Sequence, residues 1–135
     1  MPRMYPNVRV YVAGPIRGKN PTPANMTRNV NKAMDVWARL TEAGILAYVP
    51  HTDYFMARRN PQTFEGWETQ DFMDIDFPWL RTCNIFLRLP GESHGADVEQ
   101  AEAERIGMPI LYSVEEVVEW VKEIYNTSSR IRASA

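Results

Sequence analysis

The segment GESHGADVEQAEAERIG, residues 91–107, places a carboxylate where an apolar side chain is expected. If the segment is a helix, positions 96, 99, 103 and 106 form one stripe, in which Glu99 stands among two alanines and an isoleucine. A glutamate one turn from a helix N-terminus is kept ionised by the free N–H groups and the helix dipole, as a nucleophile must be. The same pattern also fits a helix-capping acid, or a helix whose phase differs by one residue.

A second carboxylate, Asp76, precedes an expected strand at 84–89 and is expected near the same strand end as Glu99. Two carboxyl groups suit the cleavage of a glycosidic bond, in which one attacks and the other protonates or orients the leaving group. The structural alternative is a solvated or helix-capping aspartate. Neighbouring Asp71 and Asp74 make the choice among the three acids ambiguous.

The segment GPIRG, residues 14–18, directly follows an expected strand. It lacks the G-x-G-x-x-G spacing of a dinucleotide fingerprint. Its glycines nevertheless let a phosphate approach the backbone, and Arg17 offers a bidentate fork for phosphate oxygens. An ordinary turn with a surface arginine explains the segment as well.

The two histidines, His51 and His94, are spaced from Asp53 and Asp97 as H-x-D and H-x-x-D. A metal ion could use such pairs, but no Cys/His cluster supports one, so we expect no metal site. His51 ends the expected second strand and is interpreted as a polar site residue rather than a core histidine. Asp97 is better explained as a first-turn partner of the helix dipole.

Aromatic side chains occur in TDYFMARR, residues 52–59, which we expect to lie in a long polar and aromatic connection over 51–63. Tyr54, Phe55 and Met56 above a strand end could stack on a nucleobase. They could also form a lid packed on the core, and the sequence does not decide between the two.

The elements that position these residues alternate between strand and helix. Strands are expected at 8–14, 45–50, 84–89 and 109–113, with helices at 24–43, 63–80 (broken near Pro78), about 95–106 and 114–125. Alternation predicts a single Rossmann-like (flavodoxin-like) three-layer α/β domain, with a parallel sheet of four to five strands and a mobile tail at 126–135. In such folds the ligand lies beyond the carboxyl ends of the strands, so the loops at 15–23 and 90–95 should flank it.

Composition narrows the classes of partner. The chain has 135 residues, of which 44% are apolar and 24% charged, and its net charge of −2 argues against a nucleic-acid polymer as the partner. The single cysteine, Cys83, permits no internal disulfide, which is typical of the cytoplasm. No apolar run approaches the roughly 18 residues of a membrane span, and MPRMYPN resembles no signal peptide, so no membrane association is expected.

Three motifs, taken in order, resemble one family. They are YVAGPIRG, DFPWLRTCNIFLRLP and SHGADVEQAEAERIGMPI, and the resemblance that they carry runs from about residue 8 to 112. The chain resembles the nucleoside 2-deoxyribosyltransferase superfamily, and within it the 2′-deoxynucleoside 5′-monophosphate N-hydrolases. The resemblance implies a small nucleotide or nucleoside as substrate, no cofactor, and a homodimer or higher homo-oligomer.

The resemblance also assigns roles. Glu99 looks like the family nucleophile that attacks C1′ to form a glycosyl-enzyme intermediate, and Asp76 looks like the acid that serves the leaving base. The substrate contacts that it implies are Gly14, Ile16, Arg17, Gly18, His51, Ser93 and Gly95, with Arg17 and Ser93 in a 5′-phosphate cradle.

Pro15 departs from the pattern of the N-hydrolases, which tend to have serine there, whereas the transferases often carry Gly-Pro. We therefore expect hydrolysis of the N-glycosidic bond of a nucleoside 5′-monophosphate, and retain two alternatives. One is a deoxyribosyltransferase that exchanges bases between nucleosides, and the other is a non-catalytic nucleotide-binding module.

Overall fold

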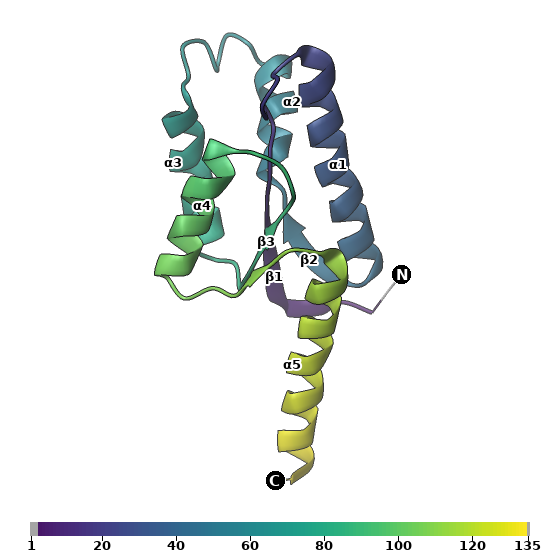
Figure 1. The fold of residues 1–135 in the computed structure, drawn as a ribbon. Coiled ribbons are helices and arrows are strands. Elements are labelled where there is room, and N and C mark those ends of the chain that lie inside the picture. Colours follow the sequence, from purple (N-terminus) through teal and green to yellow (C-terminus); the bar gives the residue numbers. More distant parts are fainter. Residues whose placement is uncertain (1–2, 135) are drawn as a thin grey trace.

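The computed structural model describes the backbone of residues 3–134 and the side chains of residues 3–127. One parallel sheet lies between two layers of helices (Figure 1). The strands are β1 (Tyr5–Ala13), β2 (Ile45–Tyr48), β3 (Ile85–Arg88) and β4 (Ile110–Leu111). The helices are α1 (Pro23–Glu42), α2 (Asp53–Arg59), α3 (Thr69–Leu80), α4 (His94–Arg105) and α5 (Val114–Ser134), with a short 3₁₀ helix, η1 (Pro50–Thr52). The predicted α/β class is confirmed, with four strands.

The strands run in the order β2-β1-β3-β4, and every pair is parallel. After β1 the chain crosses to one edge of the sheet to form β2, and it later returns to form β3 on the other side of β1. The loops that follow β1 and β3 therefore diverge to opposite faces, which is the position where open α/β sheets leave a crevice. This is the pair of loops expected from the sequence.

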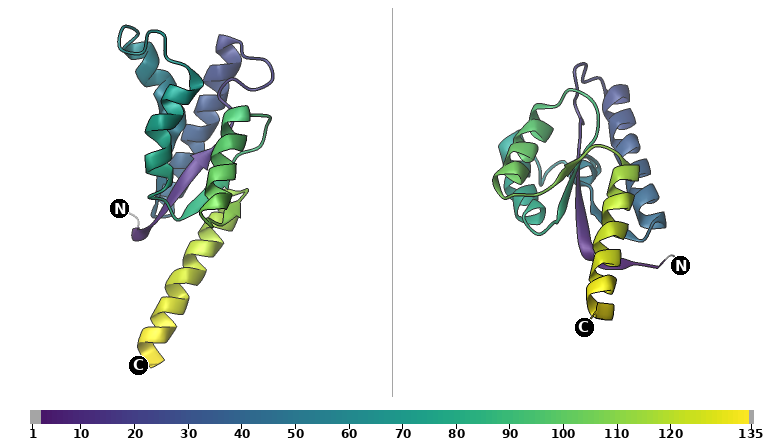
Figure 2. Two further views of the ribbon diagram at one scale, coloured as in Figure 1. Left: turned by 90° about the vertical axis from the view of Figure 1, so that its left-hand side faces the viewer. Right: turned by 60° about the horizontal axis from the view of Figure 1, so that its bottom comes forward.

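The side chains of β1 alternate between two apolar cores, because successive residues of a strand point to opposite faces. Val8, Val10 and Val12 join the core beneath α1 and α5, whereas Tyr11 and Ala13 join the core beneath α3 and α4. The right-hand view of Figure 2 shows these two layers, with the teal and green helices on one side of β1 and the blue and yellow helices on the other.

The connection expected over residues 51–63 is partly helical, so this prediction was wrong. Pro50 opens η1, where its missing N–H costs nothing, and α2 follows at once. Methionine, alanine and two arginines favour the helix, and both arginines lie in its last turn, where they complement the dipole. Tyr54, Phe55 and Met56 therefore lie on a helix and not on a loop.

The helix expected from Thr63 begins later, at Thr69, and it is not broken near Pro78. Its start is fixed by Asp71, whose Oδ2 accepts a hydrogen bond of 2.7 Å from the backbone N–H of Glu68. Pro78 lies in the last turn with an exposed ring, so it removes one backbone hydrogen bond without ending the helix.

The last helix, α5, does not end at Tyr125, the predicted end of the domain. It continues to Ser134, through most of the segment predicted to be a tail. In Figure 1 its C-terminal half extends beyond the sheet, away from the loops that follow β1 and β3. The mobility expected for residues 126–135 stays a prediction. Within the described part of the chain, no helix combines the length and the apolar character needed to cross a bilayer.

Candidate functional site

A pocket of about 920 Å³ opens at the carboxyl ends of β1 and β3. Its walls come from the two diverging loops, from η1 and α2, from α3, and from the first half of α4. Every site residue proposed from the sequence lines this one pocket: Gly14, Ile16, Arg17, Gly18, His51, Asp76, Ser93, Gly95 and Glu99. Residues separated by as many as 85 positions along the chain are thus brought together at the strand ends.

Glu99 is buried with a relative exposure of 9%, on the face of α4 that turns toward the sheet. The hydroxyl of Tyr11, from the C-terminal half of β1, donates a short hydrogen bond to Glu99 Oε2. Ala96 and Ala103 flank Glu99 on the same helix face and pack in the core. The inward direction predicted for Glu99 is confirmed, and the alternative of a different helix phase is wrong.

The charge state of Glu99 differs from the sequence-based expectation. Burial raises its pKa from 4.5 to about 7, although the Tyr11 hydrogen bond and the charge of Arg88 lower it. Glu99 is the sixth residue of α4, beyond the free N–H groups of the first turn, so the helix terminus does not hold it ionised as expected. Glu99 is therefore a carboxyl group that changes protonation near neutral pH.

Asp76 is the one buried acid of the three that the sequence left ambiguous. Its relative exposure is 6%, and Tyr48 at the end of β2 donates a 3.2 Å hydrogen bond to its Oδ1. Asp71 caps α3, and Asp74 is exposed and accepts a hydrogen bond from Gln70. The ambiguity is therefore resolved in favour of Asp76 as the pocket acid.

Asp76 has a carboxyl neighbour, Asp53, at the start of α2. Burial is the largest cause that raises the pKa of Asp76, to about 8, followed by the hydrogen bond and the charge of Asp53 and then the charge of Glu99. Burial also raises the pKa of Asp53. Two carboxyl groups in hydrogen-bonding contact do not both ionise readily, so Asp76 holds a proton at neutral pH.

His51 forms part of the pocket wall from η1, with a relative exposure of 1%. Burial lowers its pKa to about 4, against the weaker opposite effect of backbone groups of Gly14 and Pro15. The ring is therefore neutral at physiological pH. Both ring nitrogens are buried, and neither has a well-formed hydrogen bond among the described residues, which leaves them available to a ligand.

The loop after β1 and the N-terminus of α4 contribute further residues to the pocket lining. Arg17 is exposed at its rim. Ser93 is the N-cap of α4, and its Oγ accepts a 3.0 Å hydrogen bond from the N–H of Ala96. The hydroxyl proton of Ser93 remains free to donate, so capping and ligand contact are compatible in this residue.

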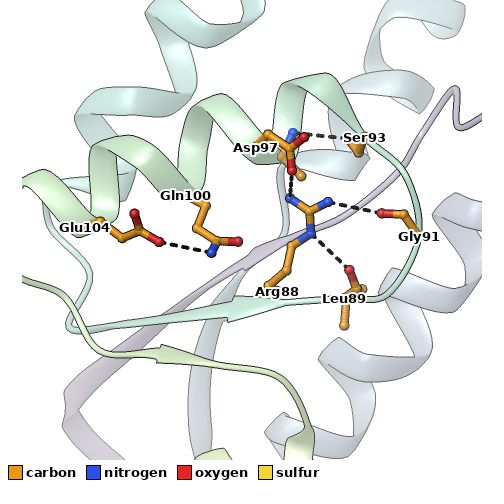
Figure 3. A network of polar contacts seen from close by, with 8 residues as sticks. Arg88, Leu89, Gly91, Ser93, Asp97, Gln100 and Glu104 are labelled. Atoms are coloured by element: carbon orange, nitrogen blue, oxygen red, sulfur yellow. Dashed lines mark hydrogen bonds and ion pairs between the residues drawn. The ribbon is translucent and has the colours of Figure 1, made fainter.

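Arg88, at the end of β3, holds the loop that follows β3 in place (Figure 3). Its guanidinium donates to the carbonyl oxygens of Leu89 (3.2 Å) and Gly91 (3.0 Å) and pairs with Asp97 Oδ1 at 2.9 Å. Asp97 also lies in the first turn of α4, so its interpretation as a structural acid is confirmed. Gly91 has a φ of +116° and lies against the ring of Pro15, which joins this loop to the loop after β1.

Comparison with known proteins gives a family but no function. A family model described as a domain of unknown function (DUF4406) matches residues 8–112. The chain belongs to the DUF4406 family. No curated protein and no solved structure is significantly similar to it. The matched span of this DUF4406 chain contains β1 from Val8 onward, the other three strands, and every residue that lines the pocket.

Four residues of this DUF4406 site escaped the sequence analysis as site residues: Tyr11, Tyr48, Asp53 and Arg88. Tyr11 was hidden in an apolar strand, and its contact with Glu99 spans 88 positions. Asp53 was considered only as a metal ligand; among the described residues, no cluster of three or more potential ligands could hold a metal ion. One feature of the sequence could have indicated the two tyrosines. Each stands among aliphatic residues in an expected strand, and a buried phenol needs a hydrogen-bond partner.

Of the three residues expected above the strand ends, only one lines the pocket. Tyr54 lines the pocket, whereas Phe55 and Met56 are exposed on α2 and do not line it. Trp67 and Phe72, which the sequence analysis did not single out, also line it, and their rings lie 5.2 Å apart. The lining of the DUF4406 pocket therefore combines aromatic rings with the buried polar groups of Glu99, Asp76 and His51.

Proposed function

We propose that this protein cleaves the N-glycosidic bond of a nucleoside 5′-monophosphate through a covalent intermediate on Glu99. The observation that supports the proposal best is a buried carboxyl group, hydrogen-bonded to Tyr11, that lines one pocket together with a second buried carboxyl group, Asp76. The resemblance of the three motifs to nucleoside 2-deoxyribosyltransferases and N-hydrolases agrees with this chemistry and assigns the same two residues to it.

In the first step, ionised Glu99 attacks C1′ of the sugar while the electrons of the C1′–N bond leave with the base. The proton of Asp76 moves to that nitrogen, so the base departs neutral. Water then attacks C1′, gives a proton to the Asp76 carboxylate, and the ester electrons return to Glu99. The two groups need opposite protonation states, and their different surroundings favour such a division.

The rest of the pocket suits a nucleotide. Its volume of about 920 Å³ lies in the range of small-molecule sites. Arg17 at the rim and the N–H groups at the start of α4 offer the donors and the positive field that a phosphate requires. The aromatic rings of the lining, which include those of Tyr54 and Trp67, offer faces for a base. We expect no cofactor, and a homodimer or higher homo-oligomer as in the family that the chain resembles.

A base-exchanging deoxyribosyltransferase is the second candidate. Pro15 favours it, because a proline in the loop after β1 removes one N–H donor from the region proposed to bind phosphate. In that reaction the nitrogen of a second base, instead of water, would attack C1′ of the intermediate.

A chromatographic screen of nucleosides and 5′-monophosphates for released base tests the proposal. We expect base and sugar phosphate from at least one monophosphate and much less base from the matching nucleoside. A second free base added to the mixture identifies a transferase, because an exchanged nucleoside then forms. Saturable nucleotide binding without release of base from any substrate would contradict the enzymatic proposal and leave a binding module.

A further inference from the structure

Asp53 takes no part in the bond changes of the mechanism above, but it contacts Asp76, the acid of that mechanism. Asp53 is the first residue of α2, and Asp76 lies in the third turn of α3, so two separate helices bring the carboxyl groups together. Both side chains line the pocket and lie within hydrogen-bonding contact of each other. This inference rests on the proposed function, in which Asp76 supplies the proton to the leaving base.

The donors around the pair indicate where the proton lies. Asp76 Oδ1 already accepts a hydrogen bond from the hydroxyl of Tyr48. Asp53 Oδ2 is buried, and no N–H, phenol or alcohol group among the described residues donates to it. A buried carboxylate oxygen without a donor is costly, so a proton on the neighbouring carboxyl group is the donor that completes the arrangement.

We propose that Asp53 is a positioning residue that accepts a hydrogen bond from Asp76 and thereby keeps the leaving-group proton on Asp76 until a substrate is bound. In the reaction, the O–H bond of Asp76 breaks as the new N–H bond of the base forms, and its electrons remain on the Asp76 carboxylate. The water that resolves the intermediate returns a proton to Asp76. Asp53 keeps its charge throughout and never bonds to the substrate.

The groups that face Asp76 from other elements shift its pKa in two directions. Asp53 on α2 and Glu99 on α4 both disfavour its ionisation, whereas Tyr48 on β2 favours it through its hydrogen bond. Burial raises the pKa of Tyr48 far above its ordinary value, so this phenol remains a donor. Tyr11 on β1, whose pKa is also strongly raised, donates to Glu99 instead. Asp53 is therefore the neighbour whose removal most directly releases the proton.

The test is the pH profile of base release by Asp53→Asn, a variant that keeps the side-chain shape and removes the charge. We expect the alkaline limb to move to lower pH by about one unit, which is an about tenfold loss on that side of the maximum. The acid limb should move the same way by less, because the charge of Asp53 also raises the pKa of Glu99. The matched control is Asp74→Asn, which removes an exposed carboxylate from α3 and should leave both limbs in place.

A uniform loss of activity at every pH, with both limbs unmoved, would show that Asp53 is only structural and would overturn the proposal. A titration of the side-chain carboxyl carbons by ¹³C NMR, on ligand-free protein, tests the same point without turnover. The Asp76 signal should titrate near pH 8 in the wild type and at lower pH in Asp53→Asn. An Asp76 signal in the ordinary aspartate range would overturn the proposal, whereas a signal near pH 8 without release of any base would contradict only the proposed enzymatic function.

Discussion

The two faces of the sheet bury different kinds of side chain. Beneath α1 and α5 the buried core cluster is wholly apolar and made largely of valine, leucine and isoleucine. Beneath α3 and α4 the second apolar cluster includes Tyr11 of β1, and two buried carboxyl groups, Asp76 and Glu99, lie on the same side of the sheet. A single strand, β1, serves both faces, with Val10 and Val12 on one side and Tyr11 on the other.

The two faces of the sheet contribute to the stability of the fold in opposite directions. Burying valine or leucine removes apolar surface from water and favours folding. Burying a carboxyl group costs free energy unless it is neutral or well paired, and burial here raises the pKa of both Asp76 and Glu99. The apolar face therefore stabilises the sheet that holds the costly groups of the other face in position. Substitutions on the two faces should therefore have different effects on stability and on activity.

The largest effect is expected for Glu99→Gln, which removes the proposed nucleophile and keeps its shape. Base release should fall by about 10³-fold or more, because the amide cannot form the glycosyl ester. The control is Glu104→Gln, on the same helix, whose carboxylate only bonds Gln100 on the surface. Turnover by Glu99→Gln near the wild-type rate would remove Glu99 from the mechanism.

The same variant should be more stable than the wild type at alkaline pH. Because the pKa of folded Glu99 is raised to about 7, the stability that this group contributes is complete below its unfolded pKa and is lost as pH rises through 7. Glu99→Gln should therefore gain on the order of 1–3 kcal/mol relative to the wild type between pH 5 and pH 8. Urea denaturation at the two pH values measures this, and an equal difference at both would contradict the raised pKa.

On the apolar face, a substitution is expected to lower stability and to leave activity unchanged. Leu40 of α1 is fully buried, so Leu40→Ala should lower the free energy of unfolding by about 2–5 kcal/mol. The turnover number at a temperature well below unfolding should stay unchanged, since Leu40 does not line the pocket. The half-exposed Leu46 on β2 gives the control, because Leu46→Ala should cost far less stability.

A smaller effect is expected for Arg17→Ala, at the pocket rim. If Arg17 binds a 5′-phosphate, KM for monophosphates should rise about ten- to a hundredfold, the value of a charged hydrogen bond. KM for nucleosides should hardly change. The control is Arg28→Ala, which removes a surface arginine of α1 that bonds Asn25 and should leave KM unchanged for both monophosphates and nucleosides. Equal increases for nucleosides and monophosphates in Arg17→Ala would favour the transferase.

The smallest effect is expected when the hydroxyl of Tyr11 or of Tyr48 is removed. The Tyr11 hydrogen bond lowers the pKa of Glu99, so Tyr11→Phe should move the acid limb of the pH profile to higher pH by about one unit. The Tyr48 hydrogen bond lowers the pKa of Asp76, so Tyr48→Phe should move the alkaline limb upward instead. Profiles in which the two variants move the same limb would contradict the division of roles between Glu99 and Asp76.

Local patterns in the sequence predicted the fold and part of the site. The strands and the 3.6-residue stripe around Glu99 were recognisable because each depends on neighbours within a few positions. The alternation of strand and helix then determined which loops meet at the carboxyl end of the sheet. His51 and Arg17 followed from that topology alone.

The partners of the acids could not be predicted, because they come from distant parts of the chain. Nothing near Tyr11 in β1 indicates that its hydroxyl meets Glu99, and nothing near Asp53 indicates Asp76. The charge of Glu99 was misjudged for a related reason. Its distance from the helix terminus is visible in the sequence, but the extent of its burial depends on the packing of α4 against the sheet.

The contact of Pro15 with Gly91 has a consequence for how quickly a ligand can bind. This contact packs the loop after β1 against the loop after β3, and the hydrogen bonds of Arg88 fix the loop after β3. A preorganised mouth does not have to be ordered on binding, so less of the interaction free energy is lost as entropy. Association should then be limited by diffusion and orientation instead of by loop closure.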